Sequence, residues 1–370
     1  MQKFLSRLFH HLMKSWSWVL LIVSAILIKW SSYYPDWVEN NFTYGIYPLI
    51  SKVQRFLFGW IPFSVGDLFY IFLSLVILFR AFRFFKLLFK KQLTRKYFAS
   101  GLQQAIFFFL FVYVFFNALW GLNYNRTGIA RQLGLQVKKY SLADLDTLTA
   151  ALQVKLNQYA LAVTEAQRDS LDKKSRLFSE ATKAYRHAAH EYSFLNYNPG
   201  SVKPSMFSYL GNYLGFQGYY NPFSGEAQVN TTVPRFLEPY VTAHEIGHQV
   251  GYARENEANF VAFLACRSSV SAGLKYSMYF DLYSYAVREI GRRDTTMARN
   301  YQQRLHPQVI KDLKELRDFF RQYKNPVEPV IMWGYGHFLK ANNQPAGKET
   351  YNEVVAWLVA YYKKFGIEAI

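Results

Sequence analysis

The stretch "TAHEIGHQVGYARENEANF", residues 242–260, contains two histidines four residues apart, with a glutamate directly after the first. On an α-helix, residues i and i+4 lie on one face, so the imidazoles of His244 and His248 would point the same way. Two ligands of one tetrahedral Zn²⁺ need this geometry. Glu245 lies about 100° further round the helix, where it can reach a water molecule at the metal more easily than the metal itself.

The residues around the two histidines predict a buried helix with defined ends. Pro239 suits the first turn of such a helix, where its missing N–H costs nothing, and Gly251 suits its end. The neighbours of the histidines carry no charge: Thr242, Ala243, Ile246, Gly247, Gln249 and Val250. A buried metal-binding helix requires this, because an unpaired charge in an apolar interior is costly.

A third ligand is predicted on the following helix, within "RENEANF" at residues 254–260. Glu255 can turn toward the metal there, while the small side chain of Ala258 lets the second helix pack close to the first. Asn259 lies one turn after Glu255, where it can hydrogen-bond a ligating group. Glu257 is the alternative third ligand, but it lies on a different face of the helix, and helical geometry favours Glu255.

The pattern His244-Glu245-x-x-His248 followed by Glu255-x-x-Ala258 resembles the zincin metallopeptidases of the gluzincin kind. The resemblance also implies an upstream edge strand that binds an extended peptide by strand addition. The candidate strand is Gly225, Glu226, Ala227, Gln228, Val229 and Asn230, and a simple hairpin strand is the alternative. The gap of six residues between His248 and Glu255 is shorter than in typical gluzincins, so it requires a tight turn at Gly251. Arg254 stands where the related metzincins have a third histidine.

A second resemblance covers most of the chain. The segments "WGLNYNR" at 120–126, "YNPFSGEAQVN" at 220–230 and "HEIGHQ" at 244–249 are similar to those of an uncharacterised family of bacterial membrane proteins. That family has N-terminal spans and no settled activity, so the resemblance implies architecture more than substrate.

Three apolar segments open the chain and predict transmembrane helices at about 16–34, 61–80 and 103–121. The second and third, at ~1.5 Å per residue, approach the ~30 Å thickness of a hydrocarbon layer. The first has an apolar run of only 13 residues, Trp16–Ile28, which also fits the core of a signal peptide. The aromatic stretch after it offers no convincing cleavage site and favours a retained span.

The distribution of charge predicts the orientation. The formal net charge is +18, and the segment 80–98 carries Lys and Arg without any acidic residue. By the positive-inside rule this loop lies in the cytoplasm, where it also meets anionic lipid headgroups, and residues 122–370 lie outside. In a bacterium with two membranes, the chain is then a multi-pass inner-membrane protein with a periplasmic domain. Because membrane topology explains the basic excess, we expect no nucleic-acid partner. Asp67, near the start of the second span, is expected to reach the interface.

Residues 122–370 predict a helix-rich extracytoplasmic domain with a small sheet, so the fold class is mainly α and zincin-like α+β after a membrane domain, 1–121. Ser141 and Asp144 form a capping box that begins one helix. His187 and His190, on a charged helix, are expected to be solvated. Tyr335 and His337 are candidate helpers that steady an oxyanion. The alternative for Tyr335 and His337 is a role in packing.

The sequence thus predicts a membrane-bound zinc metallopeptidase. Zn²⁺ is held by His244, His248 and Glu255, and Glu245 is the general base for hydrolysis of a peptide or protein substrate. The single cysteine, Cys266, excludes a site of several thiolates and is expected to be buried. Two alternatives stay open: a catalytically silent zincin-fold scaffold or binding protein, and a metal-dependent amidase that acts on a non-protein substrate.

Overall fold

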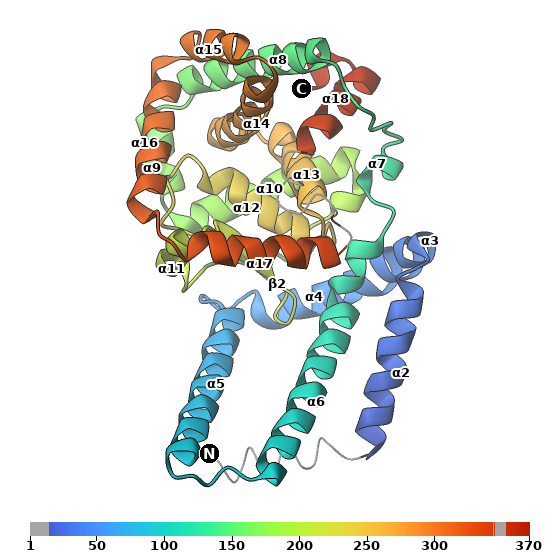
Figure 1. Cartoon of the computed structure of the whole chain (residues 1–370). Helices are drawn as coiled ribbons and strands as arrows, with labels where there is room; N and C mark the ends of the chain where they lie inside the picture. The colour runs from blue at the N-terminus through green and yellow to red at the C-terminus, as the bar shows by residue number, and fades with distance from the viewer. Residues whose placement is uncertain (1–14, 343, 345–352) are drawn as a thin grey trace.

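A computed structural model describes residues 15–342, 344 and 353–370. Three upright helices form one end of the molecule, and a larger, mostly helical domain sits on top of them (Figure 1). The upright helices are α2 (Ser15–Ser31), α5 (Val65–Phe89) and α6 (Arg95–Leu119). The prediction of a mostly helical fold with a small sheet and apolar helices that could span a membrane therefore holds in its coarse form.

Helices α5 and α6 are long and apolar enough to cross a membrane. Each has 25 residues, and their mean hydropathies are 2.0 and 1.8. At ~1.5 Å per residue, each reaches about 37 Å, more than the ~30 Å hydrocarbon layer. Helix α2 meets the same criteria only together with Pro35–Phe58, and the two parts are bent by 105°. Of the three predicted spans, two thus have the required length and composition, and the third depends on how the bent pair is counted.

The boundaries of these helices differ from those predicted. The helix expected at 61–80 runs on to Phe89, and the one expected at 103–121 already begins at Arg95. Most of the basic residues expected in a loop at 80–98 therefore lie on helical turns. Apolar residues continue between them, so α5 does not end until Lys90, and Thr94 caps α6 by accepting a hydrogen bond from the N–H of Tyr97 at 3.2 Å.

The connection between α2 and α5 packs against the upper domain. It consists of α3 (Pro35–Trp37), a π-helix η1 (Val38–Ile46) and α4 (Tyr47–Phe58). A buried ion pair joins Glu39 of η1 to Arg126, with 2.6 Å between Oε1 and Nη2. Residues of the N-terminal part and of the upper domain therefore share one interface.

The upper domain is built on a core of packed helices. Its long helices are α8 (Leu142–Ala162), α10 (Lys174–Glu191), α12 (Glu238–Gln249), α13 (Glu255–Ser268), α14 (Ala272–Arg293), α15 (Thr295–Gln303), α16 (Pro307–Tyr323), α17 (Glu328–Ala341) and α18 (Val354–Phe365). Shorter pieces are η2 (Gly121–Asn125), α7 (Ile129–Gln132), α9 (Glu165–Leu171), η3 (Ser193–Leu195), α11 (Ser208–Leu214) and η5 (Ile367–Ala369). The predicted capping box of Ser141 and Asp144 at the start of α8 is confirmed. Cys266 is fully buried in this core, as expected.

A small sheet lies beside the core. Its strands are β1 (Val202–Pro204), β2 (Gly218–Asn221) and β3 (Glu226–Val229), in the order β1-β3-β2. Strand β3 pairs in parallel with β1 and antiparallel with β2. The prediction that the segment Gly225–Asn230 is a free edge strand is therefore wrong. Strand β3 is central and buried at all four residues, so both of its hydrogen-bonding edges are occupied.

Candidate metal centre

The two histidines lie on α12, which is buried along almost its whole length. Their imidazole centroids are 4.8 Å apart, as expected for residues i and i+4 of one helix. The helix ends where predicted: Gly251 has φ +95°, a conformation that favours glycine, and the N–H of Tyr252 returns to the carbonyl of Gly247 at 3.1 Å. This tight turn lets α13 begin at Glu255 and fold back along α12.

The turn brings the three predicted ligands together. Glu255 Oε2 lies 3.1 Å from His244 Nε2 and 3.6 Å from His248 Nε2. Candidate ligand atoms of His244, His248 and Glu255 all lie within 4.8 Å of one another, and all three side chains are buried. Two imidazoles and one carboxylate in a buried cluster form a donor set that suits Zn²⁺.

The two helices can approach closely because small residues meet where they cross. A Cβ atom placed on Gly247 would lie 3.2 Å from the carbonyl oxygen of Ala258 and 2.9 Å from a methyl of Val261. Ala258 is fully buried. This contact sets the distance between the helix that carries the histidines and the helix that carries Glu255.

Each ligand is oriented by a further hydrogen bond. His244 Nδ1 donates to Asn259 Oδ1 at 2.8 Å, the role predicted for Asn259. His248 Nδ1 donates to the carbonyl of Tyr252 at 2.7 Å. Both imidazoles therefore turn Nε2 toward Glu255. The hydroxyl of Tyr335 donates to Glu255 Oε1 at 2.6 Å and fixes the carboxylate.

Glu257, the alternative ligand, faces away from the histidines. It is fully buried, and its Oε1 accepts from the N–H of Ile129 at 3.3 Å and lies 3.6 Å from Arg254 Nη1. The two residues lie about 200° apart around the helix, so Glu257 supports the start of α7 while Glu255 meets the imidazoles. Of the two glutamates, Glu255 is thus the one that lies beside the histidines, and its role as a metal ligand stays a prediction.

Glu245 lies beside the cluster without joining it. It is 4% exposed, and its Oε2 has no hydrogen-bond partner among the described residues. Its carboxylate packs against β2, because a Cβ on Gly218 would lie 2.5 Å from Glu245 Oε1. Burial raises the pKa of Glu245 to about 7, although the nearby His244 and His248 act to lower it. A buried carboxyl group with a pKa near neutrality is suited to accept and return a proton.

The electrostatics of the cluster favour added positive charge. Burial acts to lower the pKa of His244, but its hydrogen bond to Glu255 and the charges of Glu245 and Glu255 outweigh this and raise the pKa to about 9. Burial acts to raise the pKa of Glu255, yet the two histidines hold it below its ordinary value. Two buried carboxylates beside neutral imidazoles would lack a counter-charge, which a proton or a divalent cation can supply.

The remaining predicted residues lie in different places. Tyr335 reaches the cluster, but by contacting Glu255 rather than an open oxyanion position. His337 is exposed, donates to the carbonyl of Trp333 on its own helix at 2.9 Å, and does not reach the cluster. Tyr335 and His337 both belong to α17, and residues two positions apart on a helix point in nearly opposite directions. His187 and His190 are exposed on α10, as expected. Asp67 is fully buried against the upper domain, where its Oδ2 accepts from the N–H of Met206 at 2.7 Å.

Several supporting residues carry no signal in the sequence. Trp120 Nε1 donates to the carbonyl of His248 at 3.0 Å, and Tyr47 donates to the carbonyl of Gln249 at 2.7 Å. Gln344 Oε1 accepts from the N–H of Glu255 at 3.0 Å. These contacts join residues 89 to 202 positions apart, and most involve main-chain atoms, which no side-chain pattern can reveal.

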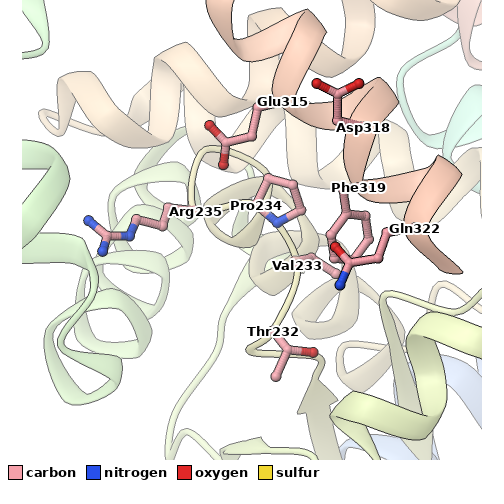
Figure 2. A pocket seen from close by; sticks show the side chains of 8 residues that line it. All are labelled: Thr232, Val233, Pro234, Arg235, Glu315, Asp318, Phe319 and Gln322. Atoms are coloured by element: carbon pink, nitrogen blue, oxygen red, sulfur yellow. The ribbon is translucent and has the colours of Figure 1, made fainter.

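A surface cleft of about 490 Å³ lies elsewhere, between the loop Thr232–Arg235 and α16 (Figure 2). Its walls carry opposite charges: Arg235 on the loop, and Glu315 and Asp318 on the helix (Figure 2). Arg235 pairs with Asp172, with 2.7 Å between Nη1 and Oδ2. None of the predicted site residues lines this cleft.

The chain belongs to a protein family whose function is unknown. The family described as "Protein of unknown function (DUF3810)" matches residues 42–359, which include the entire cluster. No curated protein and no solved structure matches the chain. The resemblance to an uncharacterised family is thereby confirmed, and the resemblance to zincins remains a prediction.

Proposed function

We propose that the protein is a membrane-bound zinc metallopeptidase. The observation that carries the proposal is the convergence of His244, His248 and Glu255, with candidate ligand atoms within 4.8 Å, beside the buried carboxylate of Glu245. Helices α2, α5 and α6 anchor the chain in the cytoplasmic membrane as three spans. Residues 122–370 lie outside, and the basic residues near the turn 90–94 contact anionic headgroups on the cytoplasmic side.

The donor set fits the ion. Zinc in hydrolytic sites is commonly held by two histidines and one glutamate, with a fourth position left open. A zinc ion held here would acidify a water molecule and polarise the scissile carbonyl. Asn259 and the carbonyl of Tyr252 keep the two Nε2 atoms directed at the ligand position, and Tyr335 orients Glu255.

Glu245 supplies the acid–base chemistry in this proposal. Its carboxylate would take a proton from the attacking water and return it to the leaving amine. The position of the group supports this role over that of a silent scaffold. Glu245 Oε2 is buried without a hydrogen-bond partner among the described residues, and a purely structural zinc site has no use for it.

The test compares the wild type with Glu245→Gln in liposomes that are loaded with zinc and supplied with a random-sequence peptide library. We expect the wild type to cleave peptide bonds and the variant to be slower by about 10²- to 10⁴-fold, with unchanged zinc content. Glutamine keeps the shape and removes the base, so loss of zinc along with activity would contradict the role assigned to Glu245. Absence of cleavage by zinc-loaded wild type would contradict the peptidase proposal and favour a scaffold or a non-peptide amidase.

A further inference from the structure

The metal cluster lies directly against the ends of the helices that could cross a membrane. Trp120, the residue that follows α6, donates to the carbonyl of the ligand His248 at 3.0 Å. Gly66, in the first turn of α5, donates from its N–H to Glu226 Oε2 of β3 at 2.7 Å. Strand β3 pairs with β2, whose Gly218 touches Glu245. A few contacts therefore connect the site with the points where α5 and α6 meet the upper domain.

Helix α4 has the pattern of a helix that lies on a membrane. Its polar residues Ser51, Gln54 and Arg55 are buried against the upper domain, where Ser51 Oγ donates to the carbonyl of Gln249 at 3.0 Å. Its opposite face exposes large apolar side chains: Leu49, Val53, Phe56 and Leu57. The bend of 105° between α2 and Pro35–Phe58 turns this part of the chain nearly at right angles to α2. If α2 crosses a bilayer, α4 then lies close to the bilayer plane.

Helix α17 also exposes apolar side chains, on another side of the cluster, and the residue that it buries is Leu339. With 14 residues it reaches about 21 Å, too short to span a bilayer. Between Glu328 and Lys340 it carries no Asp, Glu, Lys or Arg, and it exposes a row of large apolar side chains: Val330, Ile331, Trp333 and Phe338. It crosses the side of the domain that faces α5 and α6 (Figure 1). The ring of Phe338 lies 6.4 Å from that of Phe116 in the last turn of α6.

A lipid surface is the occupant that fits these exposed faces. They continue from the exposed apolar surfaces of α5 and α6, and Trp333 and Trp60, 65% and 78% exposed, are of a type enriched at membrane interfaces. In water, uncovered apolar area costs about 25 cal/mol per Å². An amphipathic helix at a membrane lies in the plane of the interface, with its apolar face in contact with the lipid.

We propose that α4 and α17 lie in the interface of the bilayer and hold the His244–His248–Glu255 cluster at its surface, so that the substrate is a polypeptide anchored in the same membrane and cut beside its anchor. The cleavage of a membrane-anchored substrate rests on the proposed peptidase function, whereas the location of the site at the bilayer surface does not. Tyr335 of α17 donates to Glu255, so the interfacial helix also supplies part of the ligand environment.

The location is tested with nitroxide labels on the full-length protein in liposomes of phosphatidylethanolamine and phosphatidylglycerol. Val330→Cys on α17 and Val154→Cys on α8 form a matched pair in a Cys266→Ala background, because the two valines are 64% and 66% exposed. Helix α8 lies at the end of the domain away from α5 and α6 (Figure 1). We expect the label at 330 to be relaxed more by oxygen than by a water-soluble nickel chelate, and the label at 154 to show the reverse.

Phe56→Cys gives an independent label on α4, with the same expectation as Val330→Cys. Equal exposure of labels 330 and 154 to the nickel chelate would overturn the proposal. Dipolar broadening between labels at 330, absent after dilution with unlabelled protein, would show that a second copy covers α17 and would also overturn it.

The substrate class is tested with a random segment of about ten residues placed either directly after a transmembrane anchor or after about 40 Gly/Ser residues, whose mean span is about 35 Å. We expect at least tenfold faster cleavage of the direct fusion, and equal rates would contradict the membrane-proximal substrate. If neither fusion is cleaved, the peptidase proposal fails, and the nitroxide measurement still decides where the site lies.

Discussion

Two helices of this protein each carry a pair of histidines, and the two pairs differ in exposure and in the carboxylate that lies near them. His187 and His190 on α10 are exposed, and Glu191 beside them is 59% exposed and lies 3.7 Å from Arg267. His244 and His248 on α12 are nearly buried, and Glu255 lies within 3.6 Å of both. Helical spacing alone therefore does not bring a His–His–Glu cluster together. The cluster on α12 also depends on a second helix that delivers a carboxylate, and on the burial of its side chains.

The comparison also shows why the second pair is held so firmly. A solvated imidazole on α10 can rotate, because water satisfies both ring nitrogens. On α12 the Nδ1 atom of each imidazole has a protein partner, Asn259 for His244 and the carbonyl of Tyr252 for His248. Buried polar groups require such partners. The same partners orient Nε2 for a metal.

Among the variants that test the buried histidine site, Gly218→Ala is expected to have the largest effect, on the rate of peptide hydrolysis. The added Cβ would lie 2.5 Å from Glu245 Oε1 and displace the carboxylate, and its three nearest neighbours are all atoms of Glu245. A misplacement of about 1 Å can cost about hundredfold in rate, so we expect that loss in peptide hydrolysis with full zinc content. Gly291→Ala is the control, since its Cβ would make only an ordinary contact of 3.5 Å with Ala298. Unchanged hydrolysis by Gly218→Ala would argue against Glu245 as the base.

Asn259→Ala is the next variant, because it makes one buried histidine resemble those on α10. Removing the acceptor of the 2.8 Å hydrogen bond frees the His244 ring, and zinc affinity is expected to fall by 10- to 100-fold. Competition with a fluorescent chelator measures it. Asn259→Asp keeps the acceptor and should restore binding. Asn256→Ala, on the same helix but bonded to Glu353, should leave affinity unchanged. Equal affinities for all three variants would break the argument from orientation.

A smaller effect is expected from Tyr335→Phe. The variant removes the 2.6 Å hydrogen bond to Glu255 Oε1 and leaves the ring in place. A hydrogen bond to a charged group is worth about 1.5 kcal/mol at the lower end of its range, so zinc affinity should fall about tenfold. Tyr279→Phe removes a hydroxyl bonded to the carbonyl of Ile370 and is the control. If both variants bind zinc equally well, Tyr335 does not position the ligand.

The smallest effect is expected from the double variant His187→Ala/His190→Ala. Both side chains are exposed, so the free energy of unfolding should change by less than about 0.5 kcal/mol, and zinc affinity should stay the same. Thermal unfolding and the same chelator competition give the two values. A marked loss of zinc in this variant would erase the distinction between the two pairs.

The sequence could predict those parts of the site that depend on one helix or one turn. The positions of His244 and His248 follow from a spacing of four residues, and the glycine at 251 marks the turn that sets the short gap. Asn259 and Glu255 lie one turn apart on α13, so their common face was readable too. Composition was enough to predict the apolar helices α5 and α6. Their ends between residues 80 and 98 could not be predicted, because apolar residues continue among the basic ones there.

What depends on distant pairing could not be predicted. Strand β3 reads as an edge strand until β1 and β2 are known to flank it, and nothing within Glu226–Val229 reveals its neighbours. The contact of Tyr335 with Glu255 could not be predicted either, because it spans 80 residues and depends on where α17 packs. The carbonyl of Tyr252 is a main-chain group, which every residue offers.

Metal content measured by mass spectrometry on the detergent-purified full chain tests the central claim most directly. The comparison is between the wild type, His244→Ala, Glu255→Ala and the double variant His187→Ala/His190→Ala, each after equilibration with excess zinc and removal of free ion. The account predicts about one zinc per chain for the wild type and the double variant, and little for the other two. Full zinc in His244→Ala and Glu255→Ala, or none in a folded wild type, would contradict it.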